Sequence, residues 1–129
     1  MRIHIFKHFF IVVALFLGAH AEAATLRVNP STGVYTANAP FTVSVLINTD
    51  GQSVNAADGQ LSFNPKELQV VSASRGSSIF NLWTEEPTFS NTAGTVSFGG
   101  GSPTGYKGTG GNVMTVTFRS LGAGAPKVT

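Results

Sequence analysis

The chain has 129 residues and carries eight Lys and Arg against six Asp and Glu, so its formal net charge at pH 7 is +2. The basic residues are scattered singly, whereas nucleic-acid binding needs them clustered, and we therefore expect no nucleic-acid partner. There is no cysteine, and the three histidines, His4, His8 and His20, all lie near the N-terminus. This distribution excludes disulfides, a lipid-modified cysteine and, beyond His20, histidine-dependent nucleophiles and the usual zinc sites.

The N-terminal segment 1–23 has the composition of an export signal. Arg2 and Lys7 form a basic start, an apolar run follows over 9–19, and residues 21–23 read Ala-Glu-Ala, the pattern of a cleavage site. An apolar run of about 11 residues is shorter than the ~20 that a membrane-spanning helix needs. We predict a signal peptide over 1–23, cleavage before Ala24, and a secreted or cell-surface domain over 24–129 without membrane insertion.

Short strand-like segments, each bounded by Gly, Pro, Asn or Ser, recur from Thr25 onward. The first covers 25–29, and the second, 41–48, alternates apolar and polar residues most clearly. An Asn-Thr-Asp-Gly turn follows, because Asp-Gly supplies the positive φ of a tight turn. Strands over 58–63 and 67–73 come next, joined by one sharp corner.

The second half of the chain is less regular. Residues 79–89 hold aromatic side chains around two acidic ones, and this pattern does not choose between a helical turn and a short strand. A strand over 95–98 precedes the glycine-rich residues 99–111, which we expect to form a flexible loop. Clean alternation returns over 112–120, and a last strand begins at Lys127. These elements predict an all-β, antiparallel two-sheet sandwich, which we expect to be truncated at its C-terminus.

The segment from Asp58 to Val70 has the strongest pattern in the chain. One side of its first strand is apolar. We expect this side, the corner that follows and the next strand to have structural roles. Their residues are Gly59, Leu61, Phe63, Asn64, Pro65, Leu68 and Val70. The other side is polar and consists of Asp58, Gln60 and Ser62. That side is either a partner-binding face or an ordinary solvated strand face.

Taken in order over about 25–129, these segments resemble the cohesin domain, the receptor module of cellulosome scaffoldins. The resemblance rests on a Pro-Ser-x-Gly turn, a Phe-Thr-Val-Ser-Val strand, the block from Ala57 to Val70, and the later strands at 94–98 and 113–118. It implies a jelly-roll sandwich related to carbohydrate-binding modules. It also implies a non-catalytic domain that binds a dockerin, a small calcium-loaded helical module, through one sheet face.

The resemblance assigns Asp58 to the acidic position of that face. The chain departs from the family pattern at two places: Ala56 stands where the family has Asn, and Asn64 replaces the Asp of an Asp-Pro corner.

Other kinds of functional site have less support in the sequence. Trp83 and Tyr106 are candidate sugar-stacking residues, although Trp83 with Phe80 and Phe89 fits a core or a loop plug better, because the aromatic residues have no regular spacing. The adjacent Glu85 and Glu86 do not suit a glycosidase, whose two carboxyls face each other about 5–10 Å apart. The glycine-rich stretch lacks the Gly-Lys-Ser/Thr ending of a P-loop. The spacing of acidic residues is not specific for calcium, and we expect no metal and no cofactor.

The sequence thus predicts a secreted, non-catalytic cohesin-like module that tethers dockerin-bearing or cell-surface components in polysaccharide degradation. Two alternatives stay open: direct binding of a surface polysaccharide, and a structural module of a surface layer or adhesin.

Overall fold

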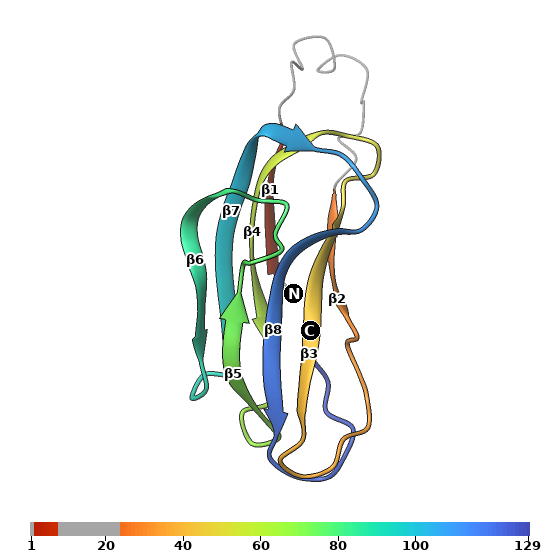
Figure 1. The fold of residues 1–129 in the computed structure, drawn as a ribbon, viewed down its shortest axis with the longest axis vertical. Coiled ribbons are helices and arrows are strands. Elements are labelled where there is room, and N and C mark those ends of the chain that lie inside the picture. Colours follow the sequence, from red (N-terminus) through yellow and green to blue (C-terminus); the bar gives the residue numbers. More distant parts are fainter. Residues whose placement is uncertain (1, 8–23) are drawn as a thin grey trace.

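Two antiparallel sheets stack on each other in the computed structural model, which describes residues 2–7 and 24–129 (Figure 1). One sheet has the strand order β1-β4-β7-β6 and the other the order β2-β3-β8-β5. The strands of the described residues are β1 (Arg2–Lys7), β2 (Thr25–Asn29), β3 (Pro40–Asn48), β4 (Val54–Ser62), β5 (Leu68–Ser74), β6 (Leu82–Ser90), β7 (Thr95–Tyr106) and β8 (Gly111–Ser120). The predicted all-β sandwich is confirmed. Within this part of the chain, no helix is long and apolar enough to span a bilayer.

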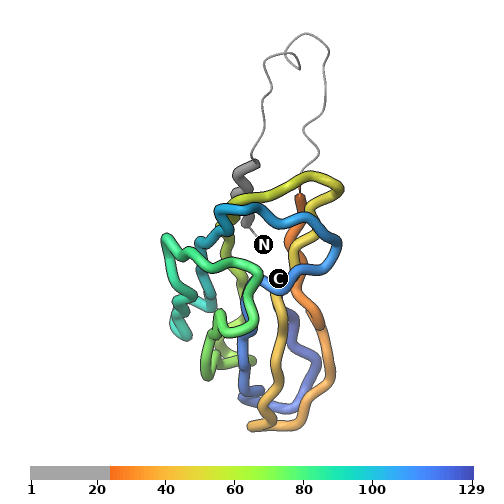
Figure 2. The backbone as a smooth tube through the Cα atoms, turned by 45° about the horizontal axis from the view of Figure 1, so that its top comes forward, coloured from red at the N-terminus to blue at the C-terminus, as the bar shows by residue number. Residues whose placement is uncertain are grey.

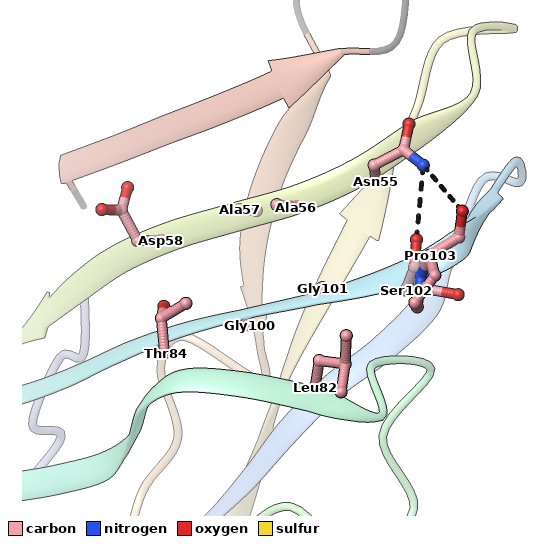
Figure 3. Close-up of a pocket in the computed structure, with 10 residues that line it drawn as sticks. All are labelled: Asn55, Ala56, Ala57, Asp58, Leu82, Thr84, Gly100, Gly101, Ser102 and Pro103. Atoms are coloured by element: carbon pink, nitrogen blue, oxygen red, sulfur yellow. Dashed lines mark hydrogen bonds between the residues drawn. The ribbon is translucent and has the colours of Figure 1, made fainter.

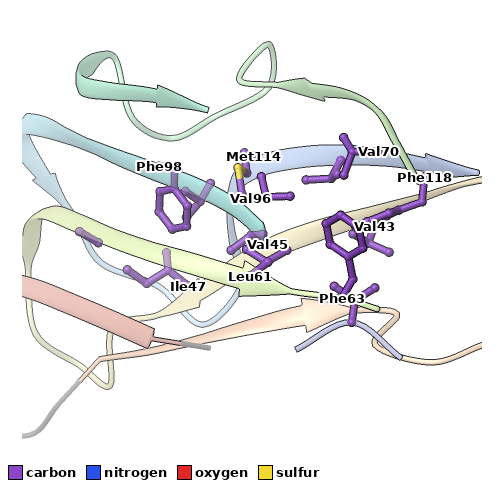
Figure 4. Close-up of a cluster of buried hydrophobic side chains, with 14 of the residues drawn as sticks. Val43, Val45, Ile47, Leu61, Phe63, Val70, Val96, Phe98, Met114 and Phe118 are labelled. Carbon is purple, nitrogen blue, oxygen red and sulfur yellow. The ribbon is translucent and has the colours of Figure 1, made fainter. Parts of the chain in front are cut away.

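The core lies between the sheets, because the strands alternate apolar inward residues with polar outward ones (Figure 4). Its fully buried large side chains include Phe98, Phe118, Ile47, Leu61, Leu68 and Met114. The Phe118 ring meets that of Phe63 edge-on at 5.2 Å and stacks on that of Phe41 at 5.6 Å between centroids. Burying one such side chain contributes about 1.5–3 kcal/mol, so this core is the main source of stability.

The sharp corner after β4 carries the chain from one sheet to the other. The side-chain Oδ1 of Asn64 accepts a hydrogen bond from the backbone N–H of Lys66 at 2.9 Å. The backbone oxygen of Asn64 accepts one from the N–H of Leu68 at 3.0 Å, which closes the turn. The two strands predicted on either side of this corner therefore exist, but they pair with different neighbours in opposite sheets.

At the other end of the sandwich, two further links between the sheets lie side by side (Figure 2). The turn after β3 contains Asp50 and Gly51, both with positive φ, as the sequence predicts. The backbone N–H of the buried Thr49 donates to the oxygen of Gly108 at 2.8 Å, and the N–H of Gly108 donates to Thr49 Oγ1 at 3.1 Å. One buried threonine therefore holds the β3–β4 and β7–β8 links together.

The glycine-rich residues 99–111 do not form a loop, and this prediction was wrong. β7 continues through Gly99, Gly100 and Gly101 to Tyr106, leaving only residues 107–110 between β7 and β8. The three glycines pair with β4 on one side and with β6 on the other. Ladder hydrogen bonds on both sides offset the conformational entropy that glycine loses in a strand.

Several other strands lie where the sequence predicts them, whereas the C-terminal residues differ from the prediction. The strands predicted at 25–29, 41–48 and 112–120 are confirmed within one residue, and residues 82–90 of the undecided stretch form a strand. Near the C-terminus, Lys127 and Val128 make isolated bridges to Thr32 and Phe63 rather than a regular strand. β1 lies inside the predicted signal peptide, whose apolar run and cleavage site fall outside the described residues.

Asn91, in the β6–β7 hairpin, fastens the two sheets to each other. Its side-chain Oδ1 accepts a hydrogen bond from the backbone N–H of Val70 at 2.7 Å, and its Nδ2 donates to the Val70 oxygen at 3.1 Å. Val70 lies on β5, at an irregularity in the pairing of β5 with β8. One amide thus satisfies both backbone groups of a residue in the opposite sheet.

We expect Asn91→Ala to lower the free energy of unfolding by about 1–3 kcal/mol, because the partly buried N–H and C=O of Val70 lose their partner. Urea denaturation followed by circular dichroism measures this change. Thr92→Ala is the matched control, because Thr92 is exposed in the same hairpin and its truncation should cost less than about 0.5 kcal/mol. Equal stability of the two variants would contradict the role given to Asn91.

Candidate partner-binding face

The outer surface of the sheet containing β4, β7 and β6 carries the polar residues that the sequence singled out. Asp58 is paired in register with Gly99, and Gln60 with Ser97. The Nε2 of Gln60 donates a hydrogen bond to Ser97 Oγ at 3.2 Å, while Ser62 is exposed at the end of β4. Asp58, Gln60 and Ser62 therefore follow one another along the same side of β4.

A hollow of about 510 Å³ lies on this surface between β4 and β6 (Figure 3). Ala56 and Asp58 line it from β4, Leu82 and Thr84 from β6, and Gly101 from β7 between them. We call this surface the hollowed face. It exists because the central strand has no side chain to fill the space above its backbone.

The glycines of β7 differ in how much room they have. A Cβ added at Gly99 would lie 2.9 Å from Thr84 Oγ1, whose side chain can rotate, and 3.4 Å from the Asp58 Cβ, which is ordinary van der Waals contact. A Cβ at Gly101 would collide with the backbone oxygen of Asn55. On the inner side, a Cβ at Gly100 would meet the ring of Trp83 at 2.9 Å. Gly101 and Gly100 are therefore required by packing, whereas Gly99 lies beneath the side chains of Thr84 and Asp58 and has more room.

The hollowed face combines hydrogen-bond acceptors with an apolar contact. Asp58 Oδ1 is buried without a hydrogen-bond partner among the described residues, and so is Asn55 Oδ1. The Nδ2 of Asn55 is engaged, since it donates to the backbone oxygens of Ser102 and Pro103 at 3.4 and 3.3 Å. Across from them, the side chain of Leu82 is 59% exposed. The face thus suits a partner that brings hydrogen-bond donors and an apolar group.

The two candidate sugar-stacking residues lie apart from this face. Trp83 is half-buried against the core, edge-on to Phe80 at 6.1 Å between centroids, and the guanidinium of Arg75 lies 5.8 Å from its ring centroid. Tyr106 is half-buried as well, with its ring over Gly111. The structure therefore does not bring Trp83 and Tyr106 together as one platform.

The acidic side chains in the described part of the chain do not gather into one site. Glu86 makes a salt bridge of 2.7 Å with Arg75, and Glu85 Oε1 accepts a long hydrogen bond of 3.5 Å from Thr88. Asp50 is exposed in the turn after β3 and does not line the hollow. Among residues 2–7 and 24–129, no three His, Cys, Asp or Glu side chains gather in a way that could hold a metal ion.

A family model described as the cohesin domain matches residues 25–129. The chain belongs to the cohesin domain family. No curated protein matches the chain.

Solved cohesins share the fold of this one. The third ScaC cohesin of Acetivibrio cellulolyticus, solved in complex with the ScaB dockerin, is 21% identical with a TM-score of 0.55, over 66% of this chain and 62% of that one. The seventh ScaB type I cohesin of Pseudobacteroides cellulosolvens is 16% identical with a TM-score of 0.53, over 69% and 64%. This cohesin thus spans less than two thirds of either structure.

A third neighbour is a type II cohesin in a cohesin–X-dockerin complex of Acetivibrio cellulolyticus. It is 16% identical with a TM-score of 0.52, over 82% of this chain and 75% of that one. These sequence identities are low, so the similarity supports the sandwich fold but gives no information on the details of the hollowed face.

Leu82, Thr84 and Gly101 of the hollowed face were not expected from the sequence. Leu82 and Thr84 belong to the stretch whose secondary structure was undecided, and Gly101 to the expected loop. The usable signal was the run of three consecutive glycines between residues with strand propensity, which indicates close backbone approach as well as flexibility.

The glycines of this cohesin should respond differently to one added methyl group. We expect Gly101→Ala to lower the free energy of unfolding by about 1–3 kcal/mol, since a backbone oxygen blocks the new Cβ. Gly99→Ala should change it by less than about 1 kcal/mol, because only the Thr84 side chain must move. Thermal and urea denaturation of both variants measure the difference, and a more costly Gly99→Ala would contradict the packing described.

Proposed function

We propose that this cohesin binds a dockerin-like helical module through the hollowed face. The observation that carries the proposal is the bare centre of that face, where β7 contributes glycines between Asp58 and Leu82. A helix can approach the sheet backbone closely there, because no side chain of β7 stands in its way. Membership of the cohesin family and the dockerin complexes of two similar structures support the choice of partner.

Each side of the hollowed face has its own part in binding. Leu82 supplies an exposed apolar anchor, and a few side chains that become buried on binding dominate the energy of most protein interfaces. Asp58 accepts hydrogen bonds from the partner, which satisfies an oxygen that is otherwise buried without one. Gln60 is held by Ser97 and presents a fixed polar group beside them. Binding needs no reacting group, in keeping with a non-catalytic module.

The cellular setting is part of the same proposal. The basic start, apolar run and Ala-Glu-Ala site of segment 1–23 support export. An exported module of this kind would tether dockerin-bearing proteins, among them polysaccharide-degrading enzymes, outside the cell or at its surface.

Binding should depend on the charge of Asp58. We expect Asp58→Asn to weaken binding of dockerin modules encoded in the same genome by about tenfold or more, since a charged acceptor contributes about 1.5–3 kcal/mol to a hydrogen bond. Asp50→Asn is the matched control, because it removes the same charge from an exposed turn. Isothermal titration calorimetry measures both.

The apolar anchor should matter to a similar degree. In the same titration, Leu82→Ala should weaken binding by about fivefold or more, while Val34→Ala, which truncates a side chain 85% exposed, should not change it. Wild-type affinity in both Asp58→Asn and Leu82→Ala would refute the proposed face. A genome without dockerin-type calcium-loop repeats would refute the proposed partner.

Export predicts a defined new N-terminus. We expect mass spectrometry of the chain recovered outside a producing bacterial cell to find Ala24 as its first residue. Ala23→Arg should block cleavage, because signal peptidase sites require small residues. Recovery of the uncleaved chain in the cytoplasm alone would contradict the proposal.

A further inference from the structure

The hollow on the outer face changes character along its length (Figure 3). At one end, Ala56 on β4 and Leu82 on β6 both pair in register with Gly101 of β7. At the other end, the hollow is lined by Asp58 and Thr84. One step of two residues along β7, about 6.7 Å, separates the two ends. The hollow therefore suits an elongated group that is apolar along its length and polar at its tip.

A second carboxylate stands beside the polar end. Asp58 on β4 and Glu85 on β6 pair in register with Gly99 from opposite sides. A Cβ built at Gly99 would lie 3.4 Å from the Asp58 Cβ and 3.6 Å from the Glu85 Cβ, so both side chains leave the same surface of the sheet. Glu85 is exposed, and its Oε1 contacts Thr88 at 3.5 Å. The two acids therefore form no site on their own, but a group held above Gly99 can reach both.

The strands that frame the hollow hold no basic residue to balance these carboxylates. β4, β6 and β7 contain no Lys or Arg, and Arg75, at the start of the β5–β6 loop, makes its salt bridge with Glu86. Within residues 24–129, neither Asp58 nor Glu85 makes a salt bridge. Two like charges side by side repel each other, and a cation placed between them removes that cost. The surface is therefore complementary in charge to a basic group of the partner.

We propose that the hollow receives one long basic side chain of the dockerin-like module, an inference that rests on the proposed function. The methylene stem lies over the backbone of Gly101 between Ala56 and Leu82, and the charged head reaches Asp58 and Glu85. Lysine and arginine both cover apolar surface with their stems while the head stays polar. Arginine fits better, because two carboxylates can share its planar fork of donors and because it is less strongly hydrated than an ammonium.

Other classes of side chain fit the hollow less well. A neutral apolar residue would cover the carboxylate of Asp58, whose Oδ1 already lacks a hydrogen-bond partner among the described residues, and would remove it from water at a cost in free energy. An acidic residue would be repelled by both carboxylates. A short hydroxyl side chain could reach Asp58 but would leave the apolar end between Ala56 and Leu82 unfilled. Only a long basic side chain uses both ends of the hollow.

A small probe tests the site without any dockerin. We expect N-acetyl-arginine methylamide, titrated into the full chain, to shift the backbone amide signals of Gly99 and Gly101 in a two-dimensional nitrogen–proton NMR spectrum. The citrulline compound has the same shape and no charge, so it should bind at least about fivefold more weakly. Equal binding of the two compounds would overturn the proposal. So would the absence of a saturable shift at these glycines with the arginine compound.

Two kinds of variant separate the charge from the apolar end. Glu85→Gln should weaken binding of the arginine compound by about threefold or more and leave that of the citrulline compound unchanged, since only the charged head loses a contact. Glu67→Gln is its control, because it removes the same charge from the exposed turn after β4. Ala56→Leu should weaken binding of both compounds, because its side chain takes the place of the stem. Ala37→Leu, in an exposed loop, should weaken neither.

The outcomes distinguish this inference from dockerin binding itself. If a dockerin module binds and neither Glu85→Gln nor Ala56→Leu changes its affinity, the proposed function stands and the basic side chain is refuted. If no dockerin module of the same genome binds, but the arginine compound binds and Glu85→Gln weakens it as expected, the receiving site stands and its partner is of another kind. The Glu85→Gln comparison decides alone if Ala56→Leu lacks a cooperative melting transition.

Discussion

The absence of side chains at Gly99, Gly100 and Gly101 is the constraint on which both surfaces of one sheet depend. Toward the core, Gly100 makes room for the Trp83 ring, and with it for the aromatic packing beneath β6. Toward solvent, Gly101 lines the hollow between Asp58 and Leu82. Where β7 presents only its backbone to the outer face, the flanking strands supply the binding groups. The same run of glycines therefore allows close packing toward the core and leaves part of the outer face free for a partner.

Much of the fold could be predicted, because period-two alternation reports directly which strand residues face a core. The strands containing Val45 and Val116 follow from that pattern alone. The pattern fails where glycine replaces the inward residues, as at Gly100, because glycine carries no hydropathy signal and is read as a loop. It also cannot show which strands become neighbours. The two strands around Asn64 look like a local pair, yet the corner carries them into opposite sheets.

The candidate face was predictable only in part for the same reasons. The direction of Asp58, Gln60 and Ser62 follows from alternation within one strand. The partners of these residues across the sheet, Gly99 and Ser97, depend on a long crossover through β5 and β6 that no local signal specifies. Leu82 could not be assigned to the face, since its segment combines a Pro, two acids and three aromatic residues without a regular period. The resemblance to the cohesin family predicts the fold, but it does not predict which residues contact each other.

Hydrogen bonds fasten the sandwich at both of its ends. Asn91 joins Val70 at the end where β4 finishes, and residues 128–129 join Ser31 and Ser62 at that same end. At the opposite end, Thr49 bonds with Gly108, and the backbone oxygen of Asn112 accepts a hydrogen bond from the N–H of Ile79 at 2.8 Å. The sheet that carries the hollow is therefore held in place before a partner arrives. Such preorganisation lowers the entropy cost of ordering the interface on binding.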